Sequence, residues 1–483
     1  MPYPHIIHHG AVNGVTGSCH QLVMNANASL LIDCGLFQGN EKSANASVHG
    51  QQQGIDFCLE GIKALVVTHV HADHVGRIPW LLAAGFEGPI ICSEPSAKLL
   101  PLVLEDAFKL EISRDSKKVE RYLEYLDARI VALPYGQWHA IESGEHVLPR
   151  IRLQRAGHIL GSAYVECDLS YPAHDHNSRI VFSGDLGAPH TPLLPSPQSP
   201  ERADVLVLES TYGDRLHEDR ACRQLKLEHA IDKALADHGT LLIPAFSIGR
   251  TQELLCEIED ILHRKAILAV NPAAANKDQS LPVNWPQVII DSPLAGRLTA
   301  AYRQLEPYWD GPARERLSNN RNPLLFEQLI TIDSHAKHLQ TVNYLSSTGR
   351  PAIVIAASGM CSSGRIVNYL KAMLSDPRHN VLFVGYQAQG TVGANIQKYG
   401  STGGFVELEG ERCIIRAGVS SLGGYSAHAD QQDLLNFVSG IDPLPKQIRL
   451  VHGELFAKET LGNELYKLYN TRSQSLELLI PEY

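Results

Sequence analysis

Short apolar runs that end at a polar residue recur through the first 210 residues of the chain. Ser29–Ile32 ends at Asp33, and Ile180–Phe182 is followed closely by Asp185. Apolar runs of this length, bounded by turn residues, are typical of buried strands. Because the polar residues follow the strands directly, we expect the side chains that carry chemistry to gather at the carboxyl ends of those strands.

The pattern changes between about residues 214 and 400, where apolar strands alternate with longer helical stretches. Strands are expected at 241–244, 288–291, 352–355 and 380–384, with helices that include 220–236 and 251–262. This alternation is typical of βαβ units and predicts a largely parallel sheet flanked by helices. The stretch 271–286, rich in Pro, Asn and Ala, is expected to be a surface loop.

Short strands return near the C-terminus, where a helix is expected at 431–438 and a strand at 448–451, directly before His452. A chain of 483 residues is too long for one ordinary hydrophobic core. We therefore expect an α/β protein with two domains, or with one large domain that carries an insertion.

The composition narrows the class of protein. Hydrophobic residues make up 44% and charged residues 19%, as in an ordinary globular enzyme, and no apolar run approaches the roughly 20 residues of a membrane helix. The nine cysteines include no C-x-x-C pair, and the N-terminus has no secretory pattern, so we expect reduced thiols and a cytoplasmic location. The net charge of -10 argues against nonspecific wrapping of nucleic acid by the whole surface.

The densest group of metal-ligand residue types follows the apolar run Ala64–Val67. His69, His71, Asp73 and His74 all lie within six consecutive positions. A single imidazole at a strand end is usually an ordinary hydrogen-bonded residue, but four such side chains in six positions are hard to explain by packing. Because divalent cations that activate water favour histidine and carboxylate ligands, we predict a metal site here.

Three later residues enlarge this site: His158 on a glycine-flanked loop, and Asp185 and His452 after strands. Two cations about 3.5–4 Å apart can share one bridging carboxylate and one bridging hydroxide, whereas a single ion would leave too many ligands unused. We therefore expect two Zn²⁺ ions, with Mn²⁺ as an alternative. The assignment is His69, His71 and His158 to one ion, Asp73, His74 and His452 to the other, and Asp185 to both.

Several other polar residues have two interpretations. Asp33, beside a glycine, fits the cap of a turn, and the alternative is a carboxylate that orients a metal-bound imidazole. The pairs His8 and His9, and His174 and His176, have ligand-like spacing, but neither follows a convincing buried strand. We expect all four of these histidines to be surface residues.

The motif His69-x-His71-x-Asp73-His74, with Asp33 before it and His158 and Asp185 after it, resembles the signature of the metallo-β-lactamase superfamily. Later motifs resemble its β-CASP branch: Glu209 in Leu-Glu-Ser-Thr-Tyr-Gly, His428 in Tyr-Ser-Ala-His-Ala-Asp, and His452 in Val-His-Gly-Glu. The combination is most similar to the RNA-processing group of the cleavage and polyadenylation specificity factor nuclease subunit and its bacterial relatives. The resemblance covers essentially the whole chain.

The resemblance implies an α/β fold in which residues 1–210 and 406–483 form the αββα sandwich of two sheets, and residues 211–405 form an inserted β-CASP domain. It implies a zinc-dependent ribonuclease that cuts single-stranded RNA, as an endonuclease, a 5′–3′ exonuclease or both, through a metal-bridging hydroxide. Asp73, Glu209 and His428 would be catalytic. His428, polarised by Glu209, would donate a proton to the leaving oxygen, because a carboxylate beside an imidazole favours its protonated form.

Three other functions are alternatives to a ribonuclease. A DNA nuclease of the same superfamily is the first alternative, although a histidine at 452 favours RNA within the family. A small-molecule ester or thioester hydrolase would lack the inserted domain and the histidines at 428 and 452. A non-catalytic RNA-binding scaffold would not need the complete set of ligands that this chain keeps.

Candidate contacts to the RNA backbone lie in the inserted domain. Ser358 and Thr391 stand beside Gly359 and Gly390, where backbone amides can approach a phosphate closely, and Arg250 could add a positive charge. Ordinary structural turns would explain these residues equally well. We expect no membrane partner, and a homodimer is compatible with the sequence.

Overall fold

The computed structural model of the chain describes residues 3–38, 53–144, 146–218, 222–269, 285–385, 387, 390–400 and 402–482. Two compact units are present, the first formed by Met1–Leu216 with Ala427–Tyr483 and the second by His217–Ser426. The surface loop expected at 271–286 lies, apart from its last two residues, outside the described residues.

The first unit contains two sheets. The six-stranded sheet has the order β1 (His5–His8), β2 (His20–Asn25), β3 (Ala28–Ile32), β4 (Ile62–Val66), β5 (Ile90–Ser93) and β6 (Ile130–Leu133). The seven-stranded sheet has the order β21 (Glu477–Leu479), β20 (Gln447–Val451), β11 (Val205–Glu209), β10 (His176–Phe182), β9 (Ala163–Tyr171), β8 (Leu148–Arg155) and β7 (Trp138–Ala140).

The two sheets pack face to face. Their shared core includes Leu30 and Val66 from one sheet and Leu153, Val165 and Phe182 from the other, all at most 1% exposed. Residues alternate between this core and the outer face, as in β8, because successive side chains of a strand point to opposite faces.

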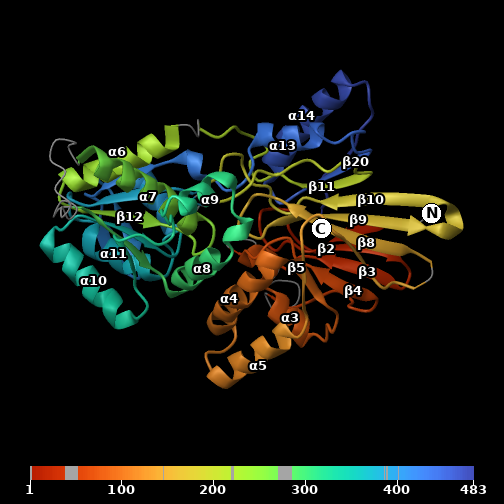
Figure 1. Ribbon diagram of the computed structural model, residues 1–483, viewed down its shortest axis with the longest axis horizontal. Coiled ribbons are helices and arrows are strands. Elements are labelled where there is room, and N and C mark those ends of the chain that lie inside the picture. Colours follow the sequence, from red (N-terminus) through yellow and green to blue (C-terminus); the bar gives the residue numbers. More distant parts are fainter. Residues whose placement is uncertain are drawn as a thin grey trace. The chain divides into compact units, whose positions relative to one another are not determined.

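Helices cover the outer faces of the sandwich (Figure 1). On the first sheet these are α3 (Ile78–Ala83), α4 (Glu94–Glu111) and α5 (Ser116–Asp127). On the second sheet, α13 (Gln431–Ser439) and α14 (Leu455–Thr471) share a separate core with the outer side chains of β11 and β20. The unit is therefore the expected αββα sandwich.

Strand register explains why distant residues meet in this unit. β10, β11 and β20 are parallel neighbours, and Glu209 at the end of β11 pairs with Val451 at the end of β20. On the other sheet, Ile32 at the end of β3 pairs with Val66 at the end of β4. Parallel strands end at the same edge, so the residues that follow them are brought together.

The second unit is built on a parallel six-stranded sheet. Its order is β14 (Leu329–Thr331), β13 (Gln287–Asp291), β15 (Ala352–Ala356), β12 (Thr240–Pro244), β16 (Asn380–Phe383) and β19 (Gly418–Ser421). Its helices are α6 (Arg223–Ala236), α7 (Arg250–Ala269), α8 (Pro293–Gln304), α9 (Gly311–Ser318), α10 (His335–Thr348), α11 (Arg365–Met373) and α12 (Val392–Gly400). A small hairpin joins β17 (Phe405–Leu408) to β18 (Glu411–Ile414).

The parallel sheet predicted for the 214–400 region is confirmed, with strands at all four expected positions. The compact unit, however, continues to Ser426 rather than ending near 405. The reason is that β19 pairs in parallel with β16, which makes it an edge strand of this sheet. Short strands alone did not show to which sheet they belong.

Two further expectations concern the whole chain. All nine cysteines are free thiols, in agreement with the absence of a disulfide framework. Among the described residues, every helix is too short or too polar to span a bilayer.

Candidate metal centre

The histidine cluster is placed by the end of β4 and the start of a short helix. β4 ends at Val66, and α2 (Ala72–Val75) begins immediately after His71. This change from extended to helical backbone turns His69 and His71 in one direction and sets Asp73 and His74 on the first helical turn. Gly35 lets the segment that carries Asp73 approach closely, because a Cβ at Gly35 would lie 1.5 Å from the Asp73 carbonyl oxygen.

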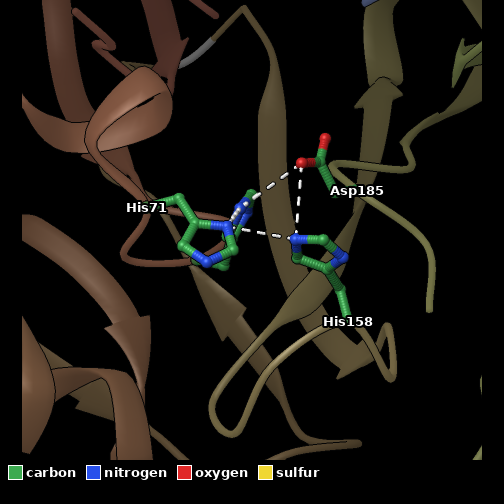
Figure 2. Close-up of side chains that lie close together, drawn as sticks. His71, His158 and Asp185 are labelled. Carbon is green, nitrogen blue, oxygen red and sulfur yellow. Dashed lines mark hydrogen bonds and ion pairs between the residues drawn. The ribbon is translucent and has the colours of Figure 1, made fainter. Parts of the chain in front are cut away.

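Four residues form the first donor group, His69, His71, His158 and Asp185. The Nδ1 atom of His71 lies 3.1 Å from Nε2 of His69 and 3.1 Å from Nε2 of His158. Oδ2 of Asp185 lies 3.5 Å from Nε2 of His69 and 3.6 Å from Nε2 of His158. Figure 2 shows the His71 and His158 rings turned toward each other and toward the Asp185 carboxylate.

These separations fit a metal ion. A tetrahedral shell with zinc–nitrogen bonds of about 2.0–2.1 Å sets neighbouring donor atoms roughly 3.3 Å apart. Burial, reinforced by the neighbouring imidazoles, lowers the pKa values of His69 and His158 well below the ordinary value. Burial also lowers the pKa of His71, to about 4. Neutral imidazoles offer the lone pairs that a metal requires.

Asp73, His74 and His452 form the second donor group. Nε2 of His74 lies 3.3 Å from Nε2 of His452, which in turn lies 3.6 Å from Oδ2 of Asp73. The group joins residues that are 378 positions apart in sequence. His74 and His452 are buried, whereas the Asp73 side chain is 24% exposed, and the first group likewise has one half-buried member, His71.

Asp185 faces both donor groups. Its Oδ2 atom belongs to the first group, while Oδ1 lies 3.3 Å from Nε2 of His74. Oδ1 is buried and accepts no hydrogen bond from the described residues, so a ligand is needed to satisfy it. Burial would raise the pKa of Asp185, but the surrounding histidines, His452 foremost, hold it well below its usual range. The seven side chains fit a metal-binding centre.

Asp33 orients His74. The Oδ2 atom of Asp33 lies 2.8 Å from Nδ1 of His74 and accepts the Thr68 hydroxyl at 2.7 Å. The Oδ1 atom of Asp33 accepts the Thr68 amide at 2.8 Å. With Nδ1–H donated to Asp33, the lone pair of His74 is on Nε2, facing Asp185 and His452. Of the two interpretations of Asp33, the geometry favours the carboxylate that orients an imidazole.

Glu209 and His428 meet at the edge of the same centre. Nδ1 of His428 lies 3.1 Å from Oε2 of Glu209, and the Glu209 carboxylate, 1% exposed, also accepts the Leu186 amide at 2.6 Å. Burial opposes protonation of His428, but the negative charges of Glu209 and Asp185 outweigh it and raise its pKa to about 9. His428 is therefore a charged imidazolium at neutral pH, and its side chain is 21% exposed.

Local backbone contacts fix the segment that carries His428. The Ala429 amide donates to the Leu186 carbonyl at 2.7 Å, and Gly187 forms an isolated bridge with His428. Gly187 is also required for the approach of the His158 loop, because a Cβ at Gly187 would lie 1.9 Å from the Gly157 carbonyl oxygen.

The sequence did not identify Thr211 as part of the centre. Its hydroxyl donates to Oε2 of Glu209 at 2.6 Å and lies 3.1 Å from Nδ1 of His452. Nδ1–H of His452 can therefore donate to the hydroxyl, which leaves Nε2 of His452 free for a metal. A threonine two residues after Glu209 in the sequence was the available signal.

The candidate phosphate contacts all lie in the second unit. Ser358 donates its amide to the Ser363 carbonyl, the Gly359 carbonyl accepts the Gln387 side chain at 2.9 Å, and the Thr391 hydroxyl accepts the Ala394 amide at 3.3 Å. Arg250 is 9% exposed and ion-paired with Glu253, so its charge is already compensated.

The remaining histidine pairs differ from each other. His174 and His176 are exposed, as expected. The expectation for His8 and His9 was wrong, because both are partly buried: Nδ1 of His8 lies 3.0 Å from Nδ1 of His20, and Nε2 of His9 lies 2.9 Å from the Gln21 side chain. Pairing of β1 with β2 places them there, and neither belongs to the metal centre.

Comparisons with known proteins agree with this architecture. Family models match in order: the metallo-beta-lactamase superfamily over residues 14–245, the Beta-Casp domain over 251–396, and the Zn-dependent metallo-hydrolase RNA specificity domain over 413–472. A ribonuclease from Thermus thermophilus is 34% identical over 475 residues, which cover 98% of this chain and 97% of that protein. The chain belongs to the β-CASP branch of the metallo-β-lactamase superfamily.

More distant members of the β-CASP branch also align over nearly the whole chain. Transcription termination factor FttA of Methanosarcina mazei is 26% identical, over 97% of this chain and 69% of that protein. The factor of the same name from Methanothermobacter thermautotrophicus is 27% identical, over 96% of this chain and 69% of that protein. The resemblance inferred from the short motifs is thereby confirmed.

Proposed function

We propose that this β-CASP protein is a metal-dependent ribonuclease that hydrolyses phosphodiester bonds of single-stranded RNA with two zinc ions bound. The observation that carries the proposal is the Glu209–His428 pair beside two donor groups that both face Asp185. Support also comes from the matched RNA specificity domain and from the relative named as a ribonuclease.

The donor atoms support zinc as the metal. Imidazole nitrogen and carboxylate oxygen suit Zn²⁺, with Mn²⁺ as the alternative for a carboxylate-containing site. His69, His71 and His158 would hold one ion, and Asp73, His74 and His452 the other, with Asp185 shared. When bound, such ions neutralise phosphate charge and lower the pKa of a water molecule that attacks phosphorus.

His428 supplies the proton that the leaving oxygen needs. Its Nδ1–H is directed to Glu209, which leaves Nε2–H as the proton that can be donated to substrate. The negative charge of Glu209 raises the pKa of His428 and so favours the protonated form, and donation of the proton to the leaving oxygen leaves a neutral imidazole. Asp73, the most exposed of the carboxylates in the centre, would receive a proton from the attacking water.

Binding of the RNA chain is assigned to Ser358, Gly359 and Thr391 in the inserted unit. The glycines beside Ser358 and Thr391 let the chain approach phosphate oxygens closely, while the Ser358 amide itself is bonded to the Ser363 carbonyl. Arg250, which is ion-paired with Glu253 on the same helix, would add positive charge to the phosphate contacts. A homodimer stays a prediction that sizing of the purified chain tests.

The decisive experiment compares end-labelled single-stranded RNA with single-stranded DNA of the same sequence, with and without a chelator. We expect cleavage of RNA that stops with chelator and returns when Zn²⁺ or Mn²⁺ is added. The lengths of labelled products distinguish internal cutting from 5′–3′ removal of nucleotides. Cleavage of DNA alone would establish the DNA nuclease alternative, and cleavage that ignores the chelator would contradict the metal mechanism.

A further inference from the structure

A buried lysine stands close to the last metal-ligand motif. Lys458, on α14, is 1% exposed, and its Nζ donates a hydrogen bond to the Val12 carbonyl oxygen. Removing an ammonium group from water is costly, so a fully buried lysine needs oxygen partners. The chain nevertheless has a lysine at this position, where an apolar residue would pack. Val12 belongs to a loop that reaches the metal centre from the opposite end of the chain.

This loop, Ala11–Ser18, holds two ligands of the second donor group by their backbones. The Ala11 carbonyl accepts the His452 amide at 2.7 Å, and the Gly14 carbonyl accepts the Gly453 amide at 2.9 Å. The Ser18 amide donates to the Asp73 carbonyl at 2.8 Å. One loop therefore connects Asp73, near the start of the chain, with His452, near its end.

The Ala11–Ser18 loop is itself closed by the Ala11 amide, which donates to the Thr16 carbonyl at 3.2 Å. Ala11 has a φ angle of 55°, in the left-handed region that is unfavourable for an alanine. His452, which it holds, also has a positive φ angle, of 51°. Because Ala11 and His452 are hydrogen-bonded to each other and both have this strained conformation, surrounding contacts must hold them in it.

We propose that Lys458 is a positioning residue for the second metal site. The proposal rests on the two-ion function above. By holding Val12, the Lys458 ammonium fixes the Ala11–Ser18 loop, and the loop fixes the backbones of His452 and Asp73. The first donor group is held differently: the His158 amide, for example, donates to the Ser162 hydroxyl at 3.0 Å. Loss of the lysine should therefore weaken one site and spare the other.

The test measures binding of Zn²⁺ to the metal-free full-length chain by calorimetric titration, with elemental analysis of the loaded protein. Lys458→Met removes the ammonium and keeps a long apolar side chain. We expect the affinity for the second ion to fall about 10- to 100-fold, as for other residues that support metal ligands, and the first ion to bind unchanged. Lys467→Met is the matched control, because Lys467 lies on the same helix but is 71% exposed.

If Lys458→Met does not fold, Lys458→Gln is tested instead, because the glutamine amide can still donate to the Val12 carbonyl. We then expect a smaller loss of Zn²⁺ affinity, again only at the second site. Unchanged affinity for both ions would overturn the proposal. An equal loss at both sites, with a lowered melting temperature, would do the same and would make Lys458 a general stabilising residue. A wild-type chain that binds fewer than two ions would instead overturn the two-ion function, and this proposal with it.

Discussion

The two donor groups of the centre are assembled in different ways. The first takes its histidines from positions 69, 71 and 158, of which His71 is half-buried and the other two are buried. The second needs His452, which comes from beyond the entire inserted unit, and includes the partly exposed Asp73. The comparison indicates that the first site forms within one continuous part of the chain, while the second forms only when both ends have folded together.

The largest effect is expected at the residue that both groups share. Asp185→Ala should remove both ions and reduce RNA cleavage to the level of the chelated enzyme, because Asp185 faces His69, His158 and His74 within 3.6 Å. Elemental analysis and cleavage assays measure this directly. Retention of two tightly bound ions by the variant would show that Asp185 does not bridge.

Loss of the proton donor should affect chemistry without affecting metal. His428→Ala is expected to lower the turnover rate about 100- to 10,000-fold, the usual range for general acid catalysis, with two ions still bound. Single-turnover cleavage measures the rate of the chemical step, and elemental analysis measures the number of bound ions. Metal loss equal to that of Asp185→Ala would contradict the role given to His428.

Substitution of Asp33, which hydrogen-bonds the ligand His74, should have a smaller effect and should weaken metal binding only at the second group. Asp33→Asn keeps the shape but turns an amide NH₂ toward Nδ1 of His74, which favours the tautomer with a proton on Nε2. We expect about 10- to 100-fold weaker binding of the second ion and unchanged binding of the first. Zinc titration of the variant measures both affinities, and weaker binding of the first ion would disprove the selective role of Asp33.

The smallest change expected is a shift of the pH profile. Protonated His428 is the active form, so activity is present below its pKa and is lost as the pH rises through that value. Because Glu209 raises the pKa of His428, Glu209→Gln should move the falling limb of the profile to lower pH. Turnover measured across a pH series reports the shift, and an unmoved limb would mean that a group other than His428 controls it.

The strands that deliver the ligands were predictable because local patterns define them. The apolar run before His69 and the runs before Asp185 and His452 all became strands, and each is followed by its ligand. The parallel register that aligns Glu209 with Val451 is a property of the fold, yet the family motifs already placed both strand ends in one site.

Other parts depend on contacts that no local pattern contains. Thr211 lies next to His452 across 241 positions, and Lys458 reaches Val12 across 446. His8 was expected at the surface because it follows no convincing buried strand, but pairing of β1 with β2 brings it against His20. In contrast, the spacing of Arg250 and Glu253 on one helix face could have predicted their ion pair.

The most direct test of the two-part centre is the number of zinc ions per chain in the wild type, His71→Ala and His452→Ala, measured by elemental analysis after extensive dialysis. We predict two ions in the wild type and one in each variant. The ion that remains should be the second in His71→Ala and the first in His452→Ala, and only His452→Ala should keep wild-type affinity for the first ion. Two retained ions in His452→Ala, or a single ion in the wild type, would contradict a centre that joins both ends of the chain.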